Sequence, residues 1–398
     1  MNTLLRPPIL RLANRTEGHE NRHRQATWLE LFFDLTFVAA VAELSKVLSE
    51  NFSPVGFLGF SLLFVPIWWS WLNATYYSDL FDTDDVLHRC LVAVSMVIVT
   101  ALATNLPHAL DVTSKGFALS YVAMRVLLIA VFLRAGWHIE LARPLAIRIA
   151  QSFSLSAALW LLSTATPTPA RFLIWIVALS IEIGMAVTAG EAVHVELAPH
   201  ESHLPERVGL FTIIVLGESV LAVVYGTSEQ QWSIQLSITA VLCFTIAFSI
   251  WWIYFDNLGG SAIQAARTCR SISAYQSWLY AHLPLNLGLA AIGVCVHHIL
   301  AEIPSEPLAL IDRGLLCFSV MICFVSLAII NLAGLSQKAG LRCKARAFRR
   351  LCAASAIALV GLLGHNFTAL AIVSCIAIIC ALQVVFDIKQ SLRLQVSP

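Results

Sequence analysis

The chain has 398 residues, of which 58% are hydrophobic and only 12% are charged, and its formal net charge is +1. Soluble domains carry about 25% charged residues, so a chain this poor in charge cannot cover a water-facing surface, and lipid must be its main solvent. The balanced charge gives no electrostatic basis for a nucleic-acid partner. No long polar stretch remains for a separate soluble domain.

The apolar runs predict an all-α integral membrane protein with twelve transmembrane helices. Runs of about 20 apolar residues, the length that crosses a bilayer, recur along nearly the whole chain. They are too long for strands and lack the alternation of a membrane barrel, so no strand is expected. The first six predicted helices cover residues 27–49, 55–77, 86–107, 117–134, 145–163 and 170–192. The second six cover residues 208–227, 232–255, 272–299, 309–332, 347–364 and 367–388.

The basic residues predict the orientation. With the N-terminus in the cytoplasm, most of the 25 lysines and arginines fall in cytoplasmic segments, as the positive-inside rule expects. An odd number of helices would break this alternation, so both termini are expected in the cytoplasm. The arginine-rich polar stretch that precedes the first apolar run is not the pattern of a cleavable signal peptide.

The two halves of the chain resemble each other. In each, a tryptophan pair precedes a Phe-Asp pair: Trp68-Trp69 and Phe81-Asp82, then Trp251-Trp252 and Phe255-Asp256. Two six-helix halves would share one orientation, and parallel repeats of this kind commonly enclose a substrate path. Chance similarity between apolar helices is the alternative. The predicted parts are a basic tail (1–26), a first repeat (27–192), a cytoplasmic linker (193–207), a second repeat (208–390) and a tail (391–398).

Ionisable side chains inside apolar helices are the first candidates for function, because each costs about 2.5–3.5 kcal/mol on insertion scales. They are Glu30, Asp34, Arg125, Glu182 and Glu218. Arg125 is the one basic residue expected at this depth, so surplus acids should be protonated, hydrated or bound to a cation. Function is favoured for Asp34 and Glu218, whereas Glu30 is expected at a solvated interface. The alternative is that Arg125 pairs with one acid and the others stabilise packing.

Amides, a histidine and prolines add a second polar layer. Asn73, His282 and Asn286 lie inside apolar helices, and Pro284 lies between the last two. A proline frees a backbone carbonyl, which a membrane helix tolerates where it lines a cavity. The tryptophans that follow Pro66 are expected in an interfacial aromatic belt rather than in a stacking site.

An acidic loop precedes the third predicted helix. Asp82, Asp84 and Asp85, followed by Arg89, could hold a hard cation, but the glycine and distal glutamate of a calcium loop are missing. A helix cap at Asp84 or Asp85 is the commoner outcome, and an ion pair with Arg89 or another loop would explain the acidity.

Two further sets of side chains could suggest metal binding. Three histidines and four glutamates in residues 191–206 could bind zinc or iron, but a solvated linker is expected and the metal stays unassigned. The ten cysteines form no Cys-x-x-Cys pair and lie mostly in apolar runs, so we interpret them as small apolar helix residues. No cofactor is predicted.

Three separated motifs resemble those of the bacterial low-temperature-requirement A (LtrA) family. They are Trp28-Leu-Glu-Leu-Phe-Phe-Asp-Leu35, Phe81-Asp-Thr-Asp-Asp85, and the run from Glu206 to Ser219 that contains Gly217-Glu218. The resemblance spans about residues 22–390 and implies a bacterial inner-membrane protein. The family name records a cold-growth phenotype and implies no catalytic residues.

The expected architecture also resembles the lysosomal potassium-channel family, whose motif is Arg…Phe-Ser-Asp. Phe33-Asp34 matches, but no serine adjoins Asp34, and Ile213 stands at the equivalent place in the second half. The resemblance therefore implies shared architecture rather than a potassium pore.

The leading hypothesis is a transporter or channel-like carrier for a proton-coupled solute or cation, in which Asp34, Glu182, Glu218 and Arg125 form a central polar network. The second is a membrane-embedded enzyme acting on a lipid or isoprenoid. It would use a divalent ion and the cytoplasmic polar residues Asp82, Asp84, Asp85, His88, Arg89 and His203. The third is a membrane-state sensor or scaffold. Membrane lipid and a small solute, proton or cation are the expected partners, and the sequence indicates no oligomeric state.

Overall fold

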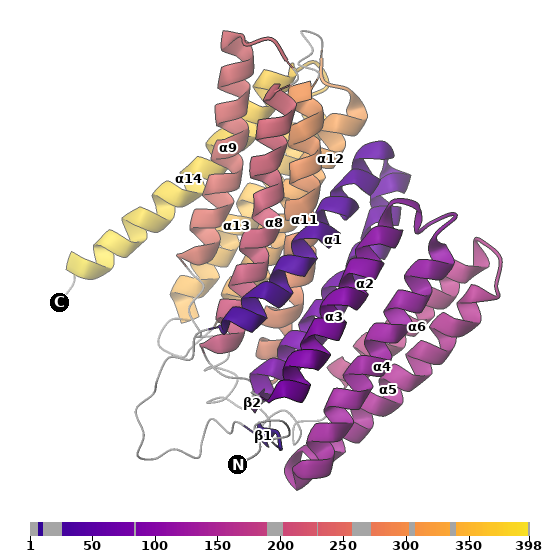
Figure 1. Cartoon of the computed structure of the whole chain (residues 1–398). Helices are drawn as coiled ribbons and strands as arrows, with labels where there is room; N and C mark the ends of the chain where they lie inside the picture. Colours follow the sequence, from indigo (N-terminus) through magenta and orange to yellow (C-terminus); the bar gives the residue numbers. More distant parts are fainter. Residues whose placement is uncertain are drawn as a thin grey trace. The chain divides into compact units, whose positions relative to one another are not determined.

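The computed structural model describes residues 7–10, 26–82, 85–188, 202–228, 230–256, 272–301, 307–334 and 340–396 (Figure 1). These residues form twelve α-helices, two 3-10 turns and one pair of two-residue strands. The helices of the first half are α1 (Trp28–Glu50), α2 (Pro54–Leu80), α3 (Val86–Asn105), α4 (Ser114–His138), α5 (Arg143–Thr164) and α6 (Ala170–Val187). Those of the second half are α8 (His203–Ser228), α9 (Ile234–Phe255), α11 (Ile272–Ala301), α12 (Leu310–Ala333), α13 (Gly340–Leu363) and α14 (Ala369–Val396). The 3-10 turns are Leu106–His108 and Glu140–Ala142.

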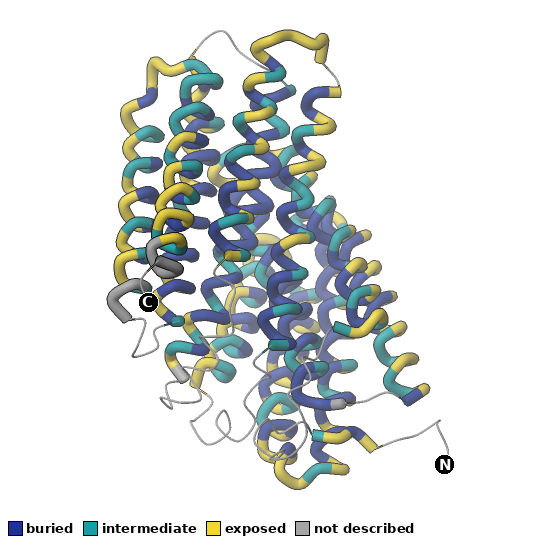
Figure 2. The backbone as a smooth tube through the Cα atoms, turned by 90° about the vertical axis from the view of Figure 1, so that its left-hand side faces the viewer, coloured by how far each residue is buried: buried dark blue, intermediate teal, exposed yellow. Residues whose placement is uncertain are grey.

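The all-α prediction is confirmed, and each predicted helix overlaps an observed one. Among the described residues, ten helices are long and apolar enough to cross a membrane, all except α1 and α13. Buried and exposed residues alternate along the helices (Figure 2), and many exposed ones are large and apolar, such as Val97, Leu173 and Val241. Apolar faces of this kind are what lipid-facing helices need.

Four helix boundaries differ from the prediction by five residues or more, and a strand pair is present. Two of them are the start of α13, at Gly340 rather than at residue 347, and the end of α14, at Val396 rather than at residue 388. Helix α8 begins at His203 rather than at residue 208, because Pro205 lies in its first turn, where a proline costs no helical hydrogen bond. Helix α6 ends at Val187, and the predicted extension to 192 lies beyond the described residues. A short antiparallel strand pair, β1 (Ile9–Leu10) and β2 (Phe81–Asp82), lies outside the predicted apolar runs.

The chain divides into two compact units. The first unit comprises residues 1–47, 59–207 and 266–272. Within it α4 packs against α3 and α5, and α5 packs against α6 (Figure 1). Its core is rich in buried aromatic rings, and the rings of Trp160 and Trp175 stack with centroids 4.7 Å apart. This packing holds α4 and α6, which carry the buried ion pair described below.

The second unit comprises residues 48–58, 208–265 and 273–398. Within it α12 packs against α13, and α14 packs against α9 and α13. Arg350 of α13 pairs with Asp387 of α14 and donates to Gln383 Oε1 at 2.7 Å, and all three side chains are buried. This pair fixes α13 to α14.

Candidate functional site

The first turns of α1 and α8 place a buried ion-pair cluster in the first unit. Arg207 Nη2 lies 2.7 Å from Asp34 Oδ1, and Arg207 Nη1 lies 3.4 Å from Glu30 Oε1. Trp71 Nε1 of α2 donates to the same Asp34 oxygen at 2.8 Å, and Arg207 also donates to Thr75 Oγ1 at 3.4 Å. Arg207 is 1% exposed and Asp34 is 2% exposed, so this charge pair is out of contact with bulk water.

His203 lies between two carboxylates beside that pair. Its Nδ1 is 2.9 Å from Asp79 Oδ1, and its Nε2 is 3.4 Å from Glu30 Oε2. Both His203 and Asp79 are almost completely buried. We call Glu30, Asp34, Asp79, His203 and Arg207 the histidine cluster.

Helical spacing explains how the chain builds this cluster. Residues four apart lie on one face of a helix, which aligns Glu30 with Asp34 on α1 and His203 with Arg207 on α8. On α2, Trp71, Thr75 and Asp79 follow the same interval. A capping box fixes the start of α1: Thr27 N donates to Glu30 Oε2 at 2.8 Å, and Glu30 N donates to Thr27 Oγ1 at 3.3 Å.

The contacts of His203 give an extra proton a place to be held between two carboxylates. A neutral imidazole has one N–H, so it can donate to only one of two carboxylates. Glu30 Oε2 accepts from Thr27, and it accepts from Nε2 of His203 when that nitrogen carries a hydrogen. The contact at Nδ1 is a second hydrogen bond when His203 is doubly protonated or when the proton lies on Asp79. In both forms Asp79, His203 and Glu30 together hold one proton more than a neutral imidazole and two carboxylates.

A second buried pair joins α4 to α6. Arg125 Nε lies 3.4 Å from Glu182 Oε1, and Tyr121 donates its hydroxyl hydrogen to Glu182 Oε2 at 3.2 Å. From α2, Trp69 Nε1 donates to Glu182 at 2.7 Å, and Ser70 Oγ accepts from Arg125 at 2.9 Å. Arg125 therefore pairs with one acid, as one of the two sequence-based alternatives stated.

Three consecutive residues of α2 thus serve both ion pairs. Trp69 and Trp71 are two residues apart, so they point to nearly opposite sides of the helix, one to Glu182 and the other to Asp34. Both tryptophans, and Trp68 before them, are buried inside the first unit. The expectation of an interfacial aromatic belt is therefore wrong for these three, because their N–H groups or rings are enclosed by the unit itself.

The remaining predicted residues lie apart from the histidine cluster or in the second unit. Asn73 donates to Trp69 O of its own helix at 2.7 Å. In the second unit, His282 is buried, with Nε2 3.1 Å from the Tyr254 hydroxyl. Asn286 is also buried there, and its amide has no hydrogen-bond partner among the described residues. Glu218 is half-buried on α8, in the second unit.

The acidic loop caps α3. Asp85 is the N-cap residue, its Oδ1 accepts from His88 N at 3.0 Å, and its Oδ2 lies 2.6 Å from Arg134 Nη2 of α4. The expected helix cap is confirmed, and the ion-pair partner comes from α4. Asp84 lies outside the described residues, and Asp82 belongs to β2. Arg89 is exposed and lines a cavity.

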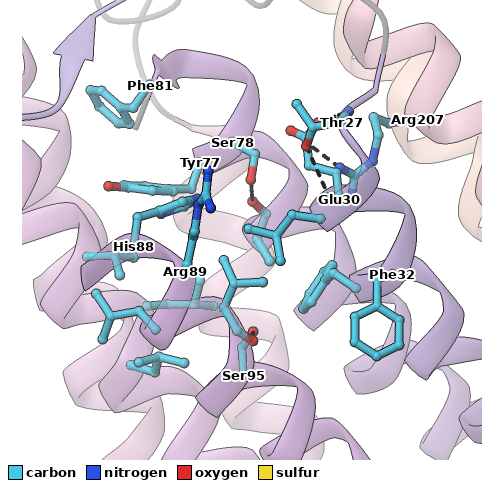
Figure 3. Close-up of a pocket in the computed structure, with 18 of the residues that line it drawn as sticks. Thr27, Glu30, Phe32, Tyr77, Ser78, Phe81, His88, Arg89, Ser95 and Arg207 are labelled. Carbon is cyan, nitrogen blue, oxygen red and sulfur yellow. Dashed lines mark hydrogen bonds and ion pairs between the residues drawn. The ribbon is translucent and has the colours of Figure 1, made fainter. Parts of the chain in front are cut away.

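That cavity, of about 610 Å³, lies among α1, α2, α3 and α4 beside the histidine cluster (Figure 3). Glu30 and Arg207 form part of its wall, with His88 and Arg89 of α3. Figure 3 shows Tyr77, Ser78, Phe81, His88 and Arg89 toward one end of the cavity and Ser95 toward the other. Within the described residues, no group of three His, Cys, Asp or Glu side chains is arranged to hold a metal ion.

Two sequence-based expectations need correction, and one buried cation was not expected. Glu30 is 9% exposed and hydrogen-bonded, so it does not lie at a solvated interface. His203 and Arg207 are buried in α8, so the predicted solvated linker does not extend through them. Arg207, at the start of α8, is as fully buried as Arg125, which was not expected from the sequence. His203 and Arg207 could have been identified in the sequence by their i, i+4 spacing, which matches that of Glu30 and Asp34.

Comparison with known proteins identifies the family. Residues 25–386 match the family described as bacterial low temperature requirement A protein (LtrA). The chain is also similar to an uncharacterized protein of Rhizobium meliloti (strain 1021), with 32% identity over 280 residues, which cover 67% of each chain. With its membrane-length helices and buried charged pairs, the chain is a polytopic membrane protein that belongs to the LtrA family.

Proposed function

We propose that the protein is a membrane carrier that couples proton movement to the passage of a small solute or cation, and that the histidine cluster holds the transferred proton. One observation carries the proposal: His203 faces a carboxylate oxygen at each ring nitrogen, 2.9 Å from Asp79 and 3.4 Å from Glu30. Histidine is the side chain whose charge changes most readily near neutral pH, and buried ionisable groups in membrane proteins commonly form proton relays.

The shared carboxylate gives a route from proton to conformation. Glu30 contacts both His203 and Arg207, whereas Asp34 contacts Arg207 at the shorter distance of 2.7 Å. When His203 is protonated, its positive charge attracts Glu30, and Arg207 is held mainly by its ion pair with Asp34. When His203 loses the proton, Glu30 becomes available to Arg207. A proton at His203 therefore changes which groups hold α1 to the first turn of α8.

We further propose that α1 and α13 complete twelve spans arranged as two parallel six-helix repeats, with both termini in the cytoplasm. Helix α1 carries five charged residues, and the first half of α13 is basic, so their charged residues set these two helices apart from the other ten. The positive-inside distribution supports the orientation. In this proposal Glu218, on α8 of the second unit, also contributes to the path. Labelling of cysteines placed in the tails, from each side of sealed vesicles, tests the orientation.

Proton flux into liposomes tests the carrier proposal. Purified protein is reconstituted with a pH-sensitive dye inside, and flux driven by a pH gradient is measured with different monovalent cations and over a range of pH. We expect His203→Gln and Asp79→Asn to abolish the flux or its pH dependence, because neither variant can hold the additional proton. The matched control is Asp387→Asn, which neutralises a buried carboxylate that pairs with Arg350 but contacts no histidine.

The control variant should lose stability and keep the pH dependence of flux. If wild-type protein, shown to be folded, moves neither protons nor cations, the carrier proposal is wrong. The lipid-directed enzyme and sensor hypotheses would then take its place. If His203→Gln transports with unchanged pH dependence, the histidine cluster is not the coupling site.

A further inference from the structure

We propose that an arginine pair of the second unit binds the phosphate group of an anionic phospholipid. The arginine pair is Arg349 and Arg350 of α13, which share Asp387 of α14. The phosphate would lie at Arg349, and the acyl chains would run along the exposed apolar residues of α13 and α14. This inference concerns lipid binding and does not depend on proton transport.

Two guanidinium groups share one carboxylate at this place. Arg349 Nη2 lies 3.0 Å from Asp387 Oδ1, and Arg350 pairs with the other oxygen of the same carboxylate. The further partners of the two arginines in the described part of the chain are neutral: Gln390 accepts from Arg349 and Gln383 from Arg350, both at 2.7 Å. Arginine stays protonated in proteins, so these three ionised groups carry one positive charge in excess.

The sequence around the arginine pair is strongly basic. Residues 335–398 contain eight lysines and arginines and a single acidic residue, Asp387, whereas the formal net charge of the whole chain is +1. The positive charge of the chain is therefore concentrated on α13 and the end of α14. Basic clusters and pockets at the end of membrane helices are typical of sites for anionic lipid head groups.

The length of an apolar run predicts the depth of the arginine pair in the bilayer. Helix α14 begins at Ala369, and residues 369–386 contain no charged residue before Asp387. At a rise of 1.5 Å per residue this run is about 27 Å long, which is close to the thickness of about 30 Å of the hydrocarbon core. We therefore expect Asp387 and its two arginines at the boundary between hydrocarbon and head groups, where lipid phosphates lie.

Arg349 is the member of the arginine pair that a lipid can reach. Its side chain is 26% exposed, whereas that of Arg350 is completely buried. Its Nε has no hydrogen-bond partner among the described residues, so this guanidinium retains a donor for a ligand. Arginine binds phosphate through two parallel N–H···O bonds, and a phosphate at Arg349 would also be attracted by the charge of Arg350.

The surface beside the arginine pair suits acyl chains. Phe348 and Leu351 flank the two arginines on α13 and are exposed, Phe348 to 68%. On α14, Leu382 and Phe386 precede Asp387 and are also exposed. An inorganic phosphate ion would leave these apolar side chains uncovered, whereas a phospholipid covers them with its chains. The geometry therefore favours a lipid phosphate over a free anion.

The excess positive charge predicts which phospholipid is preferred. Phosphatidylcholine carries a phosphate and also a quaternary ammonium group, which the arginine pair repels. Phosphatidylglycerol carries the same phosphodiester and no positive charge. A lysine or arginine near the membrane surface is worth about 1 kcal/mol of attraction for anionic lipid. We expect the paired N–H···O bonds of Arg349 to raise the preference for phosphatidylglycerol to about tenfold, which corresponds to about 1.4 kcal/mol.

Photo-crosslinking tests the proposal in the intact protein. The protein is placed in nanodiscs of phosphatidylcholine that contain a small fraction of a lipid with a diazirine in one acyl chain. This probe is either phosphatidylglycerol or phosphatidylcholine with the same chains. Labelled peptides are identified by mass spectrometry. We expect phosphatidylglycerol to label peptides of α13 and α14 about tenfold more than phosphatidylcholine does.

Variants separate a site at the arginine pair from a general attraction to the basic surface. Arg349→Gln keeps the pair of Arg350 with Asp387 and should lower labelling by phosphatidylglycerol to the level of phosphatidylcholine. Arg349→Lys keeps the charge but loses the two-nitrogen fork, so it should retain part of the preference, and it carries the test if Arg349→Gln does not fold. The matched control Lys389→Gln removes one exposed positive charge from α14 and should keep most of the preference.

Three results would overturn the proposal. Equal labelling of α13 and α14 by the two lipids would show that the surface does not select by charge. An equal loss of preference in Arg349→Gln and Lys389→Gln would show a diffuse attraction without a site at the arginine pair. Suppression of the preference by millimolar inorganic phosphate would show a site for a free anion, because a lipid held in the plane of the membrane should not be displaced at that concentration.

Discussion

Neutral replacements in the histidine cluster should destabilise the protein in a defined order. At an effective dielectric constant of about 20, charges 2.7 Å apart, as in Asp34 and Arg207, attract by about 6 kcal/mol. Charges 3.4 Å apart, as in Glu30 and Arg207, attract by about 5 kcal/mol. Desolvation offsets much of this, and removing one partner of a buried pair costs about 3–5 kcal/mol because the other charge stays buried.

Arg207→Gln should have the largest effect, because it leaves two carboxylates without their arginine. Asp34→Asn should cost about 3–5 kcal/mol. Glu30→Gln should cost about 1–3 kcal/mol, because Arg207 keeps its closer partner. The control Glu43→Gln, on the same helix, disrupts only an exposed pair with Lys46 and should cost at most about 1 kcal/mol.

The free energy of unfolding is measured by titrating the protein from mild detergent into dodecyl sulfate and following helicity by circular dichroism. The double variant Asp34→Asn/Arg207→Gln should lose less free energy of unfolding than the two single variants added together. The second change removes the Arg207 charge that Asp34→Asn leaves without its closer partner. Values for all three cluster variants within about 0.5 kcal/mol of wild type, as for surface substitutions, would refute the buried-pair reasoning.

Further predictions concern the second ion pair, the cap of α3 and the packing of α8. Glu182→Gln should lower the free energy of unfolding by about 3–5 kcal/mol, because it leaves the fully buried Arg125 without its acid. Glu182→Asp keeps the negative charge and should lose less stability. Asp85→Ala should be about 1 kcal/mol less stable than Asp85→Asn, since asparagine keeps the cap while both lose the ion pair. Gly226→Ala should cost about 1–3 kcal/mol, because its Cβ would lie 2.8 Å from a leucine side chain of α11. Gly217→Ala, where a Cβ meets nothing within 4 Å, should be neutral or stabilising. Thermal unfolding of each pair in detergent checks these differences.

Apolar run length predicted the helices, because a membrane helix must satisfy its own backbone hydrogen bonds and needs a fixed number of apolar residues. It could not predict that α8 begins at His203. Residues at a helix end can face water or a packed interior, and hydropathy does not distinguish the two. Arg207 was therefore counted among the cytoplasmic basic residues, although it is 1% exposed.

Part of the candidate site could be predicted from charged residues within apolar runs. Asp34, Glu182 and Arg125 were singled out by charge within apolar runs, and the structure buries all three. Asp79, near the end of α2, was missed because its partner His203 lies 124 residues away in the sequence. The tryptophans were assigned to an interface, but all three are buried, and the N–H groups of Trp69 and Trp71 bond to carboxylates that only the packed fold brings near. The two-repeat symmetry and the likeness to the lysosomal potassium-channel family stay predictions.

The protonation of His203 is the most direct test of the central claim. Nitrogen-15 spectra of histidine-labelled protein in lipid bilayers distinguish a doubly from a singly protonated ring, and the His203→Gln variant assigns the signal. The account predicts that His203 passes between these two forms within the pH range over which flux changes, and that Asp79→Asn shifts this transition. A His203 ring that stays neutral in one tautomer at every pH, while flux changes with pH, would contradict it.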